Sequence, residues 1–187
     1  MPRYLAATAV LLLVMLVLAR TAQFRKLGIQ VMKFGEMDKK DFFIVPFALL
    51  LFYLILAGVF RWPALGAELF GSPWAAWTGV VFCAAGIALF VWALVSFGRS
   101  FRVGLDEDHP GELVTTGAFA FSRNPIYVAF GLVLAGVFLA IPNWIFLAYL
   151  LLGGWLVNRQ IRLEEASLRK LYGEKYLSYC QKVRRFL

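Results

Sequence analysis

The stretch from Asn124 to Asn158 contains no charged side chain, and it constrains the fold more than any other feature of the sequence. It is longer than one membrane helix, since about 20 apolar residues span the hydrocarbon core of a bilayer. Pro142 and Asn143 interrupt its middle, where proline cannot continue a helix and asparagine tolerates turn geometry. The pattern predicts two helices folded into a hairpin, near Pro125–Ile141 and Pro142–Val157.

Three further apolar runs lack charges, over Tyr4–Ala19, Phe42–Phe60 and Pro73–Gly98. Only 16% of the 187 residues are charged and 61% are hydrophobic, whereas a soluble domain carries about 25% charged residues. We therefore predict an all-α integral membrane protein with about five transmembrane helices. The length allows a single membrane-embedded domain over 1–187, with N-terminal spans in 1–97 and a functional half in 98–187.

The basic residues give an orientation for five spans. Of 19 Lys and Arg residues, 17 fall in polar segments on one side, and only Arg3 and Arg61 fall on the other. The positive-inside rule then predicts an outer N-terminus and a cytoplasmic C-terminus, in a cell inner membrane or its equivalent. The net charge of +8 needs no nucleic-acid partner, because no extended polar surface interleaves basic and aromatic residues. A cleaved signal peptide is an alternative for the first run, although the basic segment after Arg20 favours its retention.

Small residues recur on helical faces within the spans. Gly79, Cys83 and Gly86 share one face of the third run, and Gly131 and Ala135 share one face of the fourth. Small residues at this spacing let helix backbones approach closely. We expect both faces to serve helix packing.

The segment Arg99–Ser122 is longer than a connection between membrane helices requires, so it is a candidate binding loop. It holds the only histidine, His109. A single histidine does not make a metal site, and an ordinary exposed loop residue is the alternative.

Adjacent carboxylates, Glu164 and Glu165, follow the last apolar run close to the membrane surface. Apolar residues continue at helical spacing, which predicts that the cytoplasmic tail begins as an amphipathic extension of the fifth span. The glutamates are costly there unless they are paired or functional. Ion pairs along the helix with Arg162, Arg169 or Lys170 are the alternative. Arg123 is similarly ambiguous, since an arginine at a span start can reach back to the interface.

Taken in order, "LVTTGAFAFSRNPIY", the hairpin and "EEASLRKLYGEKYLSYCQKVRRF" resemble the signature of the isoprenylcysteine carboxyl methyltransferases and of the related phospholipid methyltransferases. The resemblance covers the C-terminal half, and its prokaryotic character rests on Asn124, where the eukaryotic enzymes have histidine. Phe119 stands where the family often has tyrosine, so this position lacks a hydroxyl donor.

The resemblance implies a methyltransferase that depends on S-adenosylmethionine, with the cofactor between the loop before Arg123, the hairpin ends and the C-terminal helix. The implied catalytic residues are Arg123, Glu164 and Glu165. The implied cofactor-binding residues are His109, Glu112, Leu113, Val114, Gly117, Asn124 and Tyr127, and no metal is expected. No glycine-rich dinucleotide fingerprint follows a predicted strand, so a soluble Rossmann-type site is not available.

The implied substrate is lipophilic and enters from the bilayer, and membrane lipids are the expected surroundings. Carboxyl O-methylation of a prenylcysteine-like carboxylate is the first interpretation. N- or S-methylation of a phospholipid headgroup or another small lipophilic molecule is the second. A non-enzymatic membrane protein on the same scaffold is the third. The sequence does not choose between Glu164 and Glu165 and does not indicate an oligomeric state.

Overall fold

The chain is described by a computed structural model over residues 1–26, 44–60, 62, 66–98 and 112–187. Its elements are α1 (Pro2–Lys26), α2 (Ile44–Phe60), α3 (Pro73–Phe97), η3 (Gly117–Ala120), α4 (Pro125–Ala140), α5 (Trp144–Tyr172) and α6 (Glu174–Lys182). Apart from one isolated bridge between Glu68 and Asn143, these described ranges contain no β-structure. The prediction of an all-α fold is confirmed for them.

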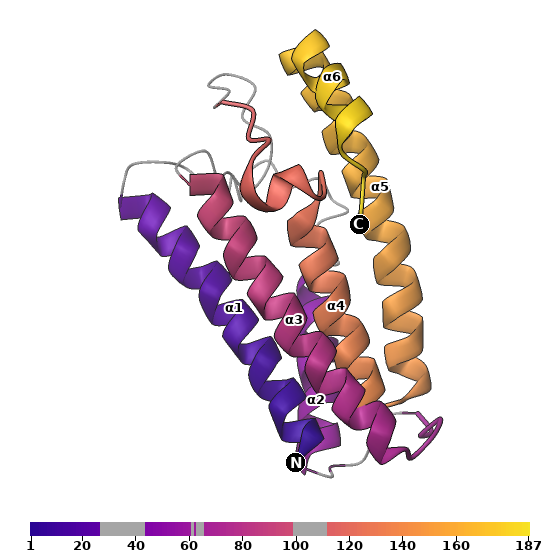
Figure 1. Cartoon of the computed structure of the whole chain (residues 1–187). Coiled ribbons are helices and arrows are strands. Elements are labelled where there is room, and N and C mark those ends of the chain that lie inside the picture. Colours follow the sequence, from indigo (N-terminus) through magenta and orange to yellow (C-terminus); the bar gives the residue numbers. More distant parts are fainter. Residues whose placement is uncertain (27–43, 61, 63–65, 99–111) are drawn as a thin grey trace.

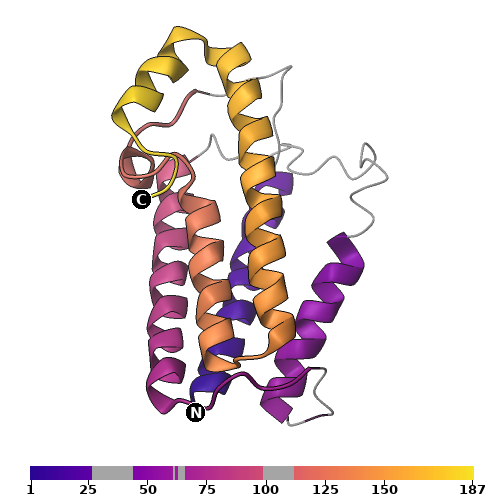
Figure 2. The same ribbon diagram turned by 90° about the vertical axis from the view of Figure 1, so that its right-hand side faces the viewer.

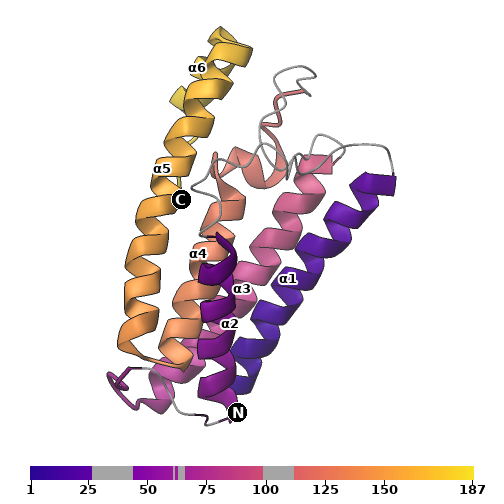
Figure 3. The ribbon, with the colours of Figure 1, turned by 180° about the vertical axis from the view of Figure 1, so that it is seen from behind.

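Five long helices form a bundle, and their chain directions alternate from α1 to α5 (Figure 1, Figure 3). The N-terminus lies at one end of the bundle. At the other end, η3 and the start of α4 lie beside α5, and α6 turns back from the end of α5 above η3 (Figure 1, Figure 2). Figure 2 shows the chain returning after α6 toward η3 and the start of α4. Segments far apart in the sequence therefore meet at this end.

Two described helices are long and apolar enough to cross a bilayer, namely Pro2–Gln23 within α1 and Pro73–Phe97 in α3. Leu49–Phe60 and Pro125–Ala140 are shorter apolar helices. The outward faces of the bundle carry large apolar side chains, such as Met15 and Val95, which are 65% and 73% exposed. Extended apolar surface of this kind suits lipid rather than water.

The closest helix packing joins α3 to α4. The predicted face of Gly79, Cys83 and Gly86 is buried there, and a Cβ on Gly79 would collide with the backbone oxygen of Gly136. The prediction for α4 is wrong, since Gly131 is exposed and has nothing within 4 Å of the Cβ position. The α4 residues that face α3 are instead Ala129 and Gly136. A Cβ on Gly86 would meet the backbone oxygen of Ala129, and a Cβ on Gly79 would meet that of Gly136.

The turn between α4 and α5 differs slightly from the predicted boundary. Helix α5 begins at Trp144 rather than Pro142, because the Asn143 side chain caps it and accepts a hydrogen bond from the Ile145 N–H at 2.7 Å. The helix then continues without a break to Tyr172. This confirms that the helix of the last apolar stretch continues into the tail.

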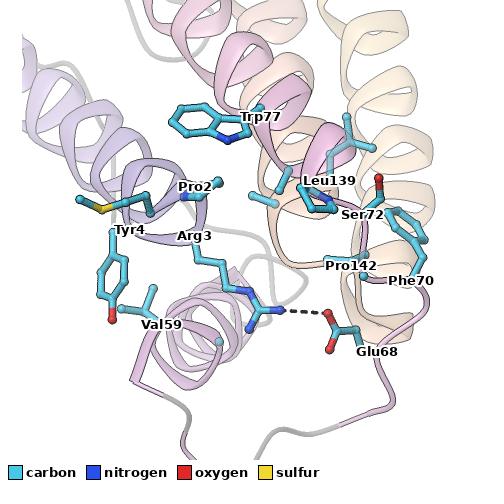
Figure 4. Close-up of a pocket in the computed structure, with 16 residues that line it drawn as sticks. Pro2, Arg3, Tyr4, Val59, Glu68, Phe70, Ser72, Trp77, Leu139 and Pro142 are labelled. Atoms are coloured by element: carbon cyan, nitrogen blue, oxygen red, sulfur yellow. Dashed lines mark hydrogen bonds and ion pairs between the residues drawn. The ribbon is translucent and has the colours of Figure 1, made fainter.

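The end of the bundle near the N-terminus contains a cavity of about 490 Å³ (Figure 4). An ion pair of 2.9 Å between Arg3 and Glu68 crosses it and links α1 to the segment before α3. The residues that line it include Tyr4, Trp77 and Pro142, and none of the predicted site residues is among them. The predicted site lies at the opposite end of the bundle.

Candidate active site

Arg123 lies immediately before α4, and its side chain turns into the protein. Asn124 occupies the N-cap position and Pro125 begins the helix, where the missing N–H of proline costs no hydrogen bond. The Arg123 side chain is only 11% exposed and places Nη2 3.0 Å from Oε1 of Glu165. Its Nε is buried and has no hydrogen-bond partner in the described part of the chain. The arginine therefore does not reach outward to the interface, and it retains an unused buried donor.

Glu165 is the buried member of the glutamate pair. Its side chain is 5% exposed and forms ion pairs with two arginines, Arg123 and Arg185. Arg185 donates from Nη2 to Oε2 at 2.6 Å and from Nε to Oε1 at 3.1 Å, which is a bidentate contact. We call Arg123, Glu165 and Arg185 the arginine–glutamate cluster. Both oxygens of Glu165 are occupied by guanidinium donors, so its main partners lie within the protein.

Glu164 has different surroundings although it is the next residue. It is partly exposed and accepts a hydrogen bond of 2.6 Å from the Tyr127 hydroxyl and one of 3.0 Å from the Gln160 side chain. Both partners are uncharged. The carboxylate of Glu164 is therefore not neutralised by an arginine or a lysine in the described chain, and it lies beside the first turn of α4.

The alternative for the glutamates, ion pairs along α5, does not hold among the described residues. Arg162, Arg169 and Lys170 are all exposed. In the described chain Glu165 forms its ion pairs with Arg123 and Arg185. The reason is the helix phase. Glu165 shares the inward face of α5 with Ile161, which is fully buried, whereas the three basic residues point to the outside.

The C-terminal segment after α6 closes the site by returning to the start of α4. The carbonyl of Arg184 accepts a hydrogen bond of 2.9 Å from the Arg123 N–H. The carbonyl of Arg185 accepts from the Asn124 side chain at 3.0 Å and from the Ser122 hydroxyl at 3.4 Å. We call residues 183–187 the C-terminal strap. The strap brings the Arg185 side chain against Glu165.

Helix α6 is attached to the site by tyrosines. The Tyr179 hydroxyl donates to the Phe119 carbonyl at 2.6 Å, and Tyr176 is 1% exposed beside it. Burial raises the pKa of the Tyr179 phenol to about 12, and the nearby positive charge of Arg123 opposes that rise. Hydrogen bonds with Glu165 raise the pKa of the Arg185 guanidinium above its usual value. These tyrosines are neutral near pH 7, so they add no negative charge to the cluster.

The remaining predicted cofactor-binding residues differ in whether they lie near the cluster. His109 lies outside the described residues, and Glu112 is exposed. Leu113 is partly buried and packs against the cluster of Tyr176, Tyr179 and Val183, and Val114 is partly buried as well. The structure thus brings Leu113, Asn124, Tyr127 and both glutamates to one end of the bundle.

Gly117 and Phe119 have structural surroundings. Gly117 has φ +63°, and a Cβ there would collide with the Ser96 hydroxyl, which accepts the Ala118 N–H at 3.0 Å. The Phe119 ring packs edge-on against Phe97 with centroids 4.7 Å apart. A tyrosine hydroxyl is not needed for this contact. The Phe119 side chain therefore packs η3 against the end of α3.

Sequence reasoning missed Arg185, Gln160 and Tyr179 as members of the site. Tyr179 was visible as part of the C-terminal motif, but its contact with a backbone carbonyl leaves no sequence signal. Arg185 belongs to a basic tail in which the positive-inside rule explains every charge equally well. Only the return of the strap to α4 distinguishes it from its neighbours.

Comparisons with known proteins identify the family of the chain. Residues 74–175, more than half of the chain, match the model of a family described as phospholipid methyltransferase. Over 137 residues the chain is 26% identical to the protein-S-isoprenylcysteine O-methyltransferase of Tribolium castaneum. This alignment covers 68% of the chain and 49% of the beetle protein, so the chain spans about half the length of that relative. No solved structure matches the chain significantly.

The apolar helical bundle and these matches together define a class, that of the membrane methyltransferases. Within it, the chain belongs to the phospholipid methyltransferase family. The resemblance seen in the motifs to isoprenylcysteine carboxyl methyltransferases is confirmed.

Proposed function

We propose that this protein uses S-adenosylmethionine to methylate the carboxylate of a lipophilic, prenylcysteine-like substrate. The observation that carries the proposal is the arginine–glutamate cluster beside Tyr127 and Glu164, at the end of an apolar bundle. A cluster with one carboxylate and two guanidiniums has a formal charge of +1, and the buried Nε of Arg123 has no hydrogen-bond partner among the described residues. Such a group suits an anionic ligand next to an apolar phase.

The residues fit the cofactor by chemical type. S-adenosylmethionine supplies an electrophilic methyl group and also carries an ammonium, a carboxylate and ribose hydroxyls. Glu164 has no cationic partner among the described residues and suits the ammonium or the hydroxyls, while Arg123 suits a carboxylate. Leu113 and Val114 offer apolar surface for the adenine. His109 and Glu112 remain candidates on the loop, whereas Gly117 and Asn124 contribute through the backbone conformation and the strap.

The chemistry of the acceptor favours a carboxylate. A carboxylic acid is already ionised near neutral pH, so methylation requires orientation and exclusion of water rather than a strong base. The positive charge and planar donor fork of the Arg123 guanidinium suit it to orient such a group. Glu165 is unsuited to act as a base, because guanidinium donors occupy both of its oxygens. Its role is to hold Arg123.

N- or S-methylation of a phospholipid headgroup is the second candidate, and the description of the matching family favours it. An amine acceptor must lose a proton, and Glu164 is the carboxylate in the site that has neutral partners. A scaffold that has lost methylation is the third candidate. In that case the cluster would serve only to hold α4, α5 and the strap together.

We also propose five membrane spans, α1 to α5, with α4 and α5 as the hairpin and α6 in the cytoplasm. The apolar outer faces and the alternating helix directions support this count. Of the two ends of the bundle, the site end carries most of the described basic residues, including Arg20, Arg123 and those of α5 and α6. Residues 1–97 would form the N-terminal spans and 98–187 the cofactor-binding half, with the N-terminus outside the inner membrane.

Binding of S-adenosylhomocysteine to the detergent-solubilised protein separates enzyme from non-enzyme. We expect saturable binding by calorimetry, and absence of binding to folded protein would refute both enzymatic readings. Transfer of radiolabelled methyl to a prenylcysteine analogue or to phosphatidylethanolamine then separates the two reactions. A base-labile product identifies the ester, and a base-stable product on phosphatidylethanolamine alone would establish the second candidate.

Glu164→Gln tests the proposed cofactor contact. The amide keeps the size and loses the charge, so the KM for S-adenosylmethionine should rise about tenfold or more. Glu174→Gln removes an exposed carboxylate from α6 and is the matched control. Equal KM values for the two variants would show that Glu164 does not bind the cofactor.

A further inference from the structure

The strap carries one side chain, Arg185, that is not among the implied catalytic or cofactor-binding residues, and it alters the charge of the arginine–glutamate cluster. Arg185 contacts both oxygens of Glu165, at 2.6 and 3.1 Å, whereas Arg123 contacts one of them at 3.0 Å. Oε1 is shared between the two arginines. Arg185 is therefore the principal partner of the carboxylate in this geometry.

Without Arg185, the net charge around Arg123 and its contacts with Glu165 would change. Glu165 and Arg123 alone form a neutral, buried pair, in which the carboxylate would draw both Nη groups of Arg123 toward itself. With Arg185 present, the cluster keeps a formal charge of +1, and Arg123 has no anionic partner other than the shared Glu165 in the described part of the chain. We propose that Arg185 is a positioning residue that occupies Glu165, so that Arg123 stays available for the carboxylate of a bound ligand.

This inference rests on the proposed function and deepens it, because it says how the arginine–glutamate cluster keeps its formal charge of +1. The carboxylate belongs either to the acceptor substrate or to the amino-acid end of the cofactor. Both have the same chemistry, and separate KM values for the two ligands distinguish them. Arg185 itself acts through Glu165 and does not touch the reacting atoms.

The strap provides a way to test the side chain without removing the strap. Its hydrogen bonds to Arg123, Asn124 and Ser122 come from the carbonyls of residues 184 and 185, so a substitution at 185 leaves these acceptors in place. Lys182 is exposed at the end of α6, and Lys182→Gln removes one positive charge from the same tail without touching the cluster. It is the matched control.

The experiment compares wild type, Arg185→Gln, Arg185→Lys and Lys182→Gln in a methyl-transfer assay with each ligand varied in turn. For Arg185→Gln we expect one of the two KM values to rise about tenfold or more, since a charge-assisted contact is lost, while kcat changes less. Arg185→Lys keeps the charge but loses the fork of donors, so it should recover part of the KM. A purely structural role would lower the melting temperature and the active fraction and leave both KM values unchanged. Both KM values within twofold of Lys182→Gln would overturn the proposal.

A second readout does not depend on turnover. An N-acetyl-S-alkylcysteine and its methyl ester differ by one carboxylate charge, and each is added during thermal unfolding of wild type and Arg185→Gln. We expect the acid to raise the melting temperature of wild type more than the ester does, and this difference to vanish in Arg185→Gln. An acid-specific shift of equal size in both proteins would overturn the inference even if wild type transfers no methyl group, which would refute the proposed function separately.

Discussion

Glu165→Gln tests whether the arginine–glutamate cluster holds the site end of the bundle together. The Glu165 side chain is 5% exposed, and its partner Arg123 is 11% exposed, so loss of the carboxylate leaves a buried guanidinium without an anion. Removal of one partner from a buried ion pair costs about 3–5 kcal/mol. Arg185 is 33% exposed and can turn toward water, which favours the lower end, about 3 kcal/mol.

For a chain of this length, 1 kcal/mol corresponds to roughly 2–4 °C in melting temperature. We therefore expect Glu165→Gln to lower the melting temperature by about 6–12 °C, measured by circular dichroism on protein in detergent. Glu164→Gln is the adjacent control. Its partners are the neutral Tyr127 hydroxyl and Gln160 amide, and a glutamine oxygen still accepts from the hydroxyl, so the expected cost is below about 1 kcal/mol.

The melting temperatures of Glu164→Gln and Glu165→Gln together test whether the arginine–glutamate cluster stabilises the fold. If Glu164→Gln lowers the melting temperature as much as Glu165→Gln, the difference in charge partners has no energetic weight and the reasoning from the cluster is wrong. If neither variant is destabilised, the buried guanidinium must find another anion or water, and the described geometry does not govern stability.

Three further predictions concern packing and titration. Gly136→Ala should destabilise the protein by about 1–3 kcal/mol, because its Cβ would meet the backbone of α3, whereas Gly154→Ala, with nothing within 4 Å, should be neutral or stabilising; denaturant unfolding measures both. Gly117→Ala should cost about 1–2 kcal/mol from the positive φ alone, before its contact with Ser96 is counted, and a melting temperature equal to wild type would contradict this. Tyr179 contributes stability that is complete below about pH 10 and is lost as the pH rises through its folded pKa of about 12, since the unfolded phenol ionises first. The gap in melting temperature between wild type and Tyr179→Phe should therefore narrow from pH 10 to pH 12, and a constant gap would show that the Tyr179 proton is not linked to folding.

Much of the architecture follows from the linear pattern of the sequence. Uncharged runs predict helices because every backbone polar group in a bilayer must be satisfied within its own segment. The break at Pro142 and Asn143 predicts the turn, and the cap on α5 moved that boundary by only two residues. The face of α4 that packs on α3 was assigned to the wrong residues, since small side chains occur on more than one face and only the neighbouring helix selects one.

The motifs by themselves determined that Arg123, Tyr127 and the glutamate pair belong together, because their order and spacing resemble a family signature. They did not separate Glu164 from Glu165, since adjacent residues on a helix differ by about 100° in direction and the inward direction depends on the packing of α5. The tertiary structure turned Glu165 inward beside Ile161 and left Glu164 with Tyr127. It also brought Arg185 to Glu165 through the fold of α6, at a separation of 20 residues. A charge partner of that kind has no local pattern, so only the folded chain could identify it.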